Sequence, residues 1–158
     1  RHKEYLDNAT PSGNSTCCLN LQRLGYLLDR PRYLELATRQ LEHMGFGFAK
    51  HPLAFSNWLQ ALDFHFGPVT EIVVLGGADL EDPLVGMLRH RFLPSRVIVR
   101  VSEETPSQEL EQAVPLVRGK KRQGNRTTVY VCQDSVCTPP VTDAPELARH
   151  LESAHLEL

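Results

Sequence analysis

The feature that most constrains this chain is a polar segment at residues 7–15, with the sequence DNATPSGNS. An apolar helical pattern begins directly after it. Pro11 restricts the backbone angle φ, and Gly13 permits angles that other residues disfavour. Ser12 or Asn14 can cap the helix that follows. The segment therefore predicts a fixed loop at the start of a helix.

This loop has two interpretations. The first amide N–H groups of a helix lack partners within it, so they and nearby polar side chains can face a polar ligand. The side chains concerned are those of Asp7, Asn8, Ser12 and Asn14. The alternative is a well-capped turn whose polar groups serve only the local backbone, and the residue types by themselves favour that alternative.

Composition excludes several classes of protein. The chain has 158 residues, of which 41% are hydrophobic and 23% charged, as in soluble globular proteins. Its net charge of −2 gives no overall field that would attract nucleic acid or a membrane. No apolar run approaches the roughly 18 residues of a membrane span. We therefore expect a cytoplasmic protein without nucleic-acid partners, membrane partners or a cofactor.

The pattern changes from helical to mixed near Gly67 and Pro68, which predicts two parts, 1–67 and 68–158. We expect an α+β or α/β chain: a helical hairpin with a third helix, then a small, mainly parallel three-stranded α/β segment. Gly45 and Gly47 are expected to end the second helix. The predicted helices are 14–29, 32–44, 52–66, 81–92, 107–117 and 144–155, and the predicted strands are 71–75, 96–101 and 127–132.

No catalytic group can be assembled from the motifs. No G-x-S-x-G elbow frames a serine. Asp7 is the one carboxylate near the candidate site, so a pair of carboxylates is not available there. We therefore expect no catalytic residues and no turnover by this chain alone.

Near the end of the chain, Cys132, Cys137, His150 and His155 have the spacing C-x4-C-x12-H-x4-H. This fits a zinc finger, in which four such ligands surround the metal. Pro139 and its neighbouring proline constrain the hairpin that such a finger needs, so zinc is an alternative and the expected metal content is none. A Cys132–Cys137 disulfide is a second alternative, similarly disfavoured in a reducing compartment.

Two motifs resemble a known family. Residues 7–15 are similar to the D-x-A-x-P-S-G-N-S signature of thioredoxin-domain-containing proteins of the spermatogenesis-associated type. Cys132, Cys137 and the Pro-Pro-Val-Thr-Asp segment at 139–143 resemble the C-terminal end of that family. The order of the elements between them fits as well, so the resemblance spans nearly the whole chain.

The resemblance implies a larger parent chain, in which a thioredoxin-like domain precedes an α/α toroid similar to six-hairpin glycosidases and N-acylglucosamine epimerases. This chain would then be a fragment: the end of the toroid and a terminal α/β segment, with the N-terminal remainder of the parent as its partner. It contains no C-x-x-C, so redox activity is not carried over. By the same resemblance, Asp7, Asn8, Ser12 and Asn14 would line the mouth of a cavity that binds sugars in related folds.

The leading hypothesis is therefore a non-catalytic module that completes a helical toroid with a cavity for a small polar or sugar-like ligand. One alternative is a fragment of a carbohydrate-active enzyme, with Asp7 as acid or base. A second alternative is a structural zinc module at the C-terminal end.

Overall fold

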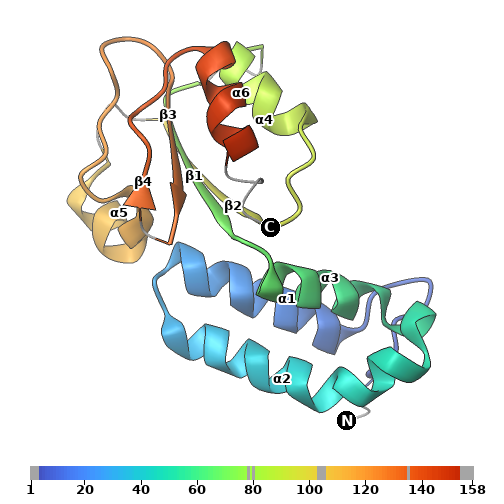
Figure 1. The fold of residues 1–158 in the computed structure, drawn as a ribbon. Helices are drawn as coiled ribbons and strands as arrows, with labels where there is room; N and C mark the ends of the chain where they lie inside the picture. The colour runs from blue at the N-terminus through green and yellow to red at the C-terminus, as the bar shows by residue number, and fades with distance from the viewer. Residues whose placement is uncertain (1–3, 78, 80, 103–105, 135, 154–158) are drawn as a thin grey trace. The chain divides into compact units, whose positions relative to one another are not determined.

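Figure 1 shows the fold in a computed structural model. The structure describes residues 4–77, 79, 81–102, 106–134 and 136–153. The chain divides into two compact units, Arg1–Gly67 and Pro68–Leu158, and each is described by itself. Within the described part of the chain, no helix has the length and apolar character that crossing a bilayer requires.

The first unit is a helical hairpin with a third helix, as predicted (Figure 1). Asp29, in the turn between the first two helices, takes a positive φ of 48°, which aspartate tolerates better than most residues. The core between the helices contains Cys18, Leu41, Trp58 and Phe64, all nearly inaccessible to solvent. The elements are α1 (Gly13–Leu27), α2 (Pro31–Lys50), the 3-10 helix η1 (Pro52–Phe55) and α3 (Ser56–Phe66).

The second helix does not end where we expected. Gly45 and Gly47 lie inside α2, which continues to Lys50. Gly47 packs against the Phe55 ring, where an added Cβ would lie 2.8 Å from Phe55 Cζ. The glycine therefore permits a close approach of η1 to the helix, and this packing outweighs the helix-ending tendency of glycine.

The second unit is a four-stranded mixed sheet in the order β2-β1-β3-β4, flanked by helices (Figure 1). Ile72, Val74 and Val131 share an apolar cluster with residues of α4 and α6 on one face of the sheet. Val73 and Leu75 belong to a separate cluster with Val117 on the other face. The elements are β1 (Thr70–Leu75), α4 (Pro83–His90), β2 (Arg96–Val101), α5 (Gln108–Ala113), the 3-10 helix η2 (Pro115–Val117), β3 (Thr128–Gln133), β4 (Val136–Cys137) and α6 (Ala144–Ser153).

The α+β class is confirmed, but the prediction of a mainly parallel three-stranded sheet is wrong in detail. β1 and β2 are parallel, whereas β3 runs antiparallel to β1 and β4 antiparallel to β3. The apolar run that predicts β3 carries no information on the direction of the strand. The segment between Val101 and Thr128 is long enough to return across the sheet either way, so the direction is set by the packing of the unit as a whole.

The close packing of α1 against α2 yields a stability prediction. A Cβ on Gly25 would lie 2.5 Å from Leu34 Cδ2, so Gly25→Ala forces the Leu34 side chain to move. We expect this overpacking to exceed the gain in helix propensity and to lower the free energy of unfolding by about 1 kcal/mol. Urea unfolding of the purified chain measures it.

Gly45 is the matched control, because nothing lies within 4 Å of a Cβ added there. Gly45→Ala should raise the free energy of unfolding by up to about 1 kcal/mol through helix propensity alone. Equal effects of the two substitutions would contradict the described contact between α1 and α2.

Candidate functional site

The polar segment at the start of the chain is organised around the carboxylate of Asp7. One carboxylate oxygen accepts hydrogen bonds from the backbone N–H of Ser12, at 2.8 Å, and from the Ser15 hydroxyl, at 2.6 Å. The other accepts from the backbone N–H groups of Asn57, at 2.9 Å, and Trp58, at 3.2 Å. Asp7 is only 5% exposed. It therefore joins the loop, the start of α1 and the start of α3 through one buried group.

Asp7 also acts as the cap of a helix that is remote in sequence. The residue at the N-cap of α3 is Phe55, which makes no side-chain capping hydrogen bond. The N–H groups of Asn57 and Trp58 in the first turn of α3 instead reach the Asp7 carboxylate, which precedes them by 50 and 51 residues. A negative charge is favourable at this end of a helix. The anion that the helix start attracts is thus supplied by the chain itself.

The hydrogen bonds control the charge of Asp7. Burial raises the pKa of its carboxyl, but the hydrogen bonds from Ser15, Ser12, Trp58 and Asn57 outweigh burial and hold the pKa below its usual value. Each donor stabilises the charged form. Asp7 is therefore a carboxylate at neutral pH whose two oxygens already hold four donors, an arrangement suited to a structural role and not to proton transfer.

Ser12 is the N-cap of α1, and its hydroxyl accepts from the backbone N–H of Ser15 at 3.1 Å. The Ser15 hydroxyl also accepts a hydrogen bond from the side-chain amide of Asn57, at 3.0 Å. Ser15 and Asn57 were not among the predicted site residues. The signal that could have found them is the start of the third helix after Pro52, because that helix has no capping side chain of its own.

The two asparagines of the predicted site lie apart from the Asp7 network. Asn8 is exposed, and its backbone N–H donates to the Thr10 carbonyl at 3.1 Å. Asn14 is half-buried, and its side-chain amide donates to the backbone carbonyl of Glu4. The structure thus brings Asp7 and Ser12 together, while Asn14 faces a different feature.

That feature is a pocket of about 340 Å³ within the first unit. Tyr5, Asn14 and Trp58 form one part of its lining, and the Trp58 indole N–H donates to the Tyr5 carbonyl at 2.8 Å. The other lining residues share a face of α2, at spacings of three and four. They are Leu36, Arg39, Gln40, His43 and Met44.

Gln40 is the most informative residue of this pocket. Its side-chain oxygen is buried and has no hydrogen-bond partner among the described residues. Buried polar atoms in folded proteins are nearly always paired, so this oxygen lacks an expected donor. It belongs to a residue of the pocket lining but is itself shielded from solvent. Sequence reasoning did not find Gln40, because a glutamine inside an amphipathic helix is typical of a solvated face.

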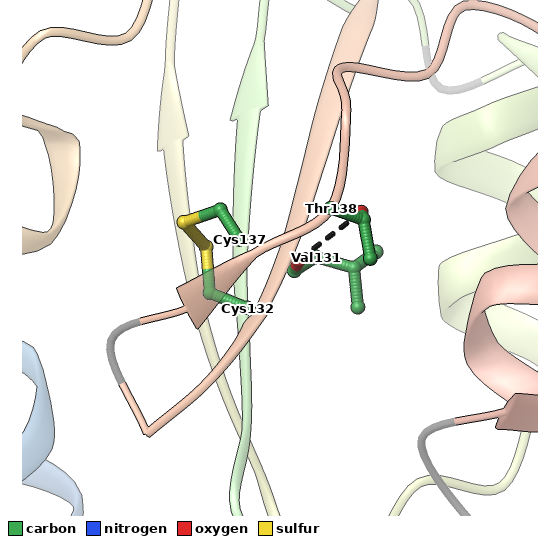
Figure 2. Close-up of a disulfide and its surroundings, with 4 residues drawn as sticks. All are labelled: Val131, Cys132, Cys137 and Thr138. Atoms are coloured by element: carbon green, nitrogen blue, oxygen red, sulfur yellow. Dashed lines mark hydrogen bonds between the residues drawn. A yellow bond between two sulfur atoms is a disulfide. The ribbon is translucent and has the colours of Figure 1, made fainter.

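In the second unit, Cys132 and Cys137 form a disulfide between β3 and β4 (Figure 2). Of the two alternatives for this pair of cysteines, the structure shows the disulfide. The bond occupies both sulfurs that the zinc pattern needs, and no group of three metal-binding side chains occurs among the described residues. His150 lies on α6, and His155 lies outside the described residues.

The Asp7 network predicts a pH-dependent loss of stability. In Asp7→Asn the side chain keeps one acceptor oxygen, while an NH2 group replaces the other. The N–H groups that bonded to the replaced oxygen then have no acceptor. We expect the free energy of unfolding at pH 7 to fall by about 3 kcal/mol. Because the folded pKa of Asp7 lies below the unfolded value, its contribution is present above about pH 4 and is lost as pH falls through the folded pKa.

Urea unfolding of the unsubstituted chain and of Asp7→Asn from pH 7 to pH 2 measures this loss of stability. The difference between their free energies of unfolding should shrink as the pH falls. Asp63→Asn, an identical change at an exposed position of α3, should stay within about 0.5 kcal/mol of the unsubstituted chain. A difference for Asp7→Asn that does not change with pH would contradict the assigned role.

Comparison with known proteins adds a further finding. The chain is 27% identical over 153 residues to spermatogenesis-associated protein 20 of Homo sapiens and of Rattus norvegicus, and 26% identical to that of Mus musculus. Each match covers 96% of this chain but 19% of the relative. No family model matches the chain, and no solved structure matches it. The chain is therefore similar to the C-terminal part of a larger protein. This similarity supports the interpretation that the chain is a module of such a protein.

Proposed function

We propose that this chain is a non-catalytic module that completes a helical toroid of a larger protein, and that its first unit binds a small polar, carbohydrate-like ligand. The coverage of the relatives supports a larger protein, since the chain spans 19% of their length. The toroid rests on the family resemblance of residues 7–15. The pocket beside α2 supports the second part. Asp7 and Ser12 have a supporting role in this proposal, because their polar atoms hold the loop and the two helix starts together.

The observation that carries the ligand proposal is the buried oxygen of Gln40. A buried acceptor without a donor costs about 1–3 kcal/mol relative to a paired one. Because this oxygen is shielded from solvent, the Gln40 side chain must rotate to present it to the pocket. A ligand hydroxyl would then supply the missing donor and recover part of this cost. A hydroxyl-rich ligand therefore fits the wall better than a purely apolar one.

The rest of the lining suits the same class of ligand. The Asn14 amide offers both a donor and an acceptor, and Arg39 adds a cation. Leu36 and Met44 provide apolar surface on the same helix face. Sugars present hydroxyl groups around a ring with apolar C–H faces, so a pocket with a few polar groups on an apolar wall is complementary to them.

The geometry does not favour an acid or base role for Asp7, the alternative that a carbohydrate-active enzyme would require. Its carboxylate is held in the charged form by the hydrogen bonds around it, with its oxygens directed at α1 and α3. A general acid needs a raised pKa and access to the substrate, and Asp7 has neither. The proposal is accordingly one of binding without turnover.

Gln40→Leu separates ligand binding from folding. The substitution removes the orphaned oxygen at similar volume, so we expect the free energy of unfolding to rise by about 1 kcal/mol. The same change removes the acceptor for the ligand hydroxyl and should weaken binding about tenfold. Titration calorimetry of the purified chain with glucose, mannose and N-acetylglucosamine, beside urea unfolding, measures both effects.

Gln60→Leu, at an exposed position of α3, is the matched control and should leave affinity unchanged. Absence of heat with all three sugars would count against the carbohydrate class. Binding that Gln40→Leu leaves intact would place the ligand elsewhere and refute the assignment of this pocket.

A further inference from the structure

The disulfide of the second unit is asymmetric in its exposure. Cys132 and Cys137 are direct partners on the antiparallel strands β3 and β4, with their Cα atoms 4.0 Å apart. Cys132 is 2% exposed, whereas Cys137 lies on the exposed strand β4 beside Val136, which is 75% exposed. A reagent from solvent therefore has access to one of the two cysteines.

The surroundings of Cys132 reinforce this difference. Glu71, which is 7% exposed, lies directly opposite Cys132 on β1. The Lys120 ammonium lies over the ring of Tyr130, two residues before Cys132 and on the same face of the sheet. Burial lowers the pKa of Lys120, and the Glu71 carboxylate acts in the opposite direction, so this carboxylate is near Lys120. An incoming thiolate thus meets packed side chains at Cys132, whereas Cys137 is open to solvent.

The strand that carries Cys137 is held by few other contacts. β4 has two residues and pairs with β3 at two positions. Beyond the pair, the backbone N–H of Thr138 donates to the Val131 carbonyl at 2.9 Å (Figure 2). β4 is also the edge of the sheet, so no further strand covers it in the described structure. The Thr138 hydroxyl also donates to the Val131 carbonyl, and Val141 forms a bridge with Val129, so backbone contacts hold this edge beside the covalent bond.

We propose that the Cys132–Cys137 disulfide is a thiol-exchange site, at which a low-molecular-weight thiol attacks Cys137 and Cys132 is the leaving sulfur. The thiolate forms a bond to Cys137 Sγ, the protein S–S bond breaks, and Cys132 leaves as a thiolate that takes a proton from water. A second thiolate attacks the mixed disulfide and releases Cys137. Two thiols are thereby oxidised to one disulfide, while the protein disulfide is reduced to two thiols.

Reduced glutathione is the probe, and the 158-residue chain with Cys17→Ser is the protein, because Cys17 is an exposed free thiol that would react as well. After short incubation and an acid quench, free thiols are blocked with N-ethylmaleimide and peptides are analysed by mass spectrometry. We expect glutathione on Cys137 and maleimide on Cys132. Chain unfolded in urea, where both sulfurs are accessible, should carry glutathione on both.

A matched pair of variants tests the same selectivity from the opposite direction. With oxidised glutathione, Cys137 in Cys132→Ser should react at least about tenfold faster than Cys132 in Cys137→Ser, since attack requires an accessible thiolate. A disulfide that stays intact in folded chain under millimolar glutathione would overturn the proposal and leave a purely structural bond. Adducts mainly on Cys132, or equal rates in the two variants, would also overturn it.

Discussion

The carboxylate of Asp7 is the interaction on which the described geometry of the first unit depends. It accepts four hydrogen bonds from two helix starts and so fixes the polar loop, α1 and α3 with respect to one another. Burying a charged carboxylate destabilises the folded state unless hydrogen bonds satisfy its oxygens. Trp58, which lines the pocket beside α2, donates its backbone N–H to this carboxylate, and Asn14 lies in the first turn of α1 between Ser12 and Ser15, which also bond to it.

Local patterns in the sequence predicted the parts of this arrangement that are local. The Ser12 cap and the start of α1 follow from a few neighbouring residues, and the structure has both. The partners of Asp7 on α3 could not be predicted in this way, because about 50 residues separate them from it. Single-sequence patterns carry no information on such pairings, and for the same reason the orphaned oxygen of Gln40 became visible only with the packed helices.

The second unit shows a similar limit. Short apolar runs located β1, β2 and β3 within one or two positions. A strand that is buried on both faces, as β1 is, requires such a run. The direction of β3 does not follow from such runs, because the connection between Val101 and Thr128 is long enough to permit either direction. The disulfide likewise depends on the pairing of Cys132 with Cys137, which the spacing allowed but did not select over zinc ligation.

The direct test of the account is the titration of the Asp7 carboxyl itself, followed by carbon-13 NMR of the side-chain carboxyl group in the folded chain. If four donors hold the charged form, the midpoint lies below the usual aspartate value of about 3.9. A midpoint at or above that value would mean that burial outweighs the hydrogen bonds. The loop would then not be fixed by a charged group, and the pocket beside it would lose its described support.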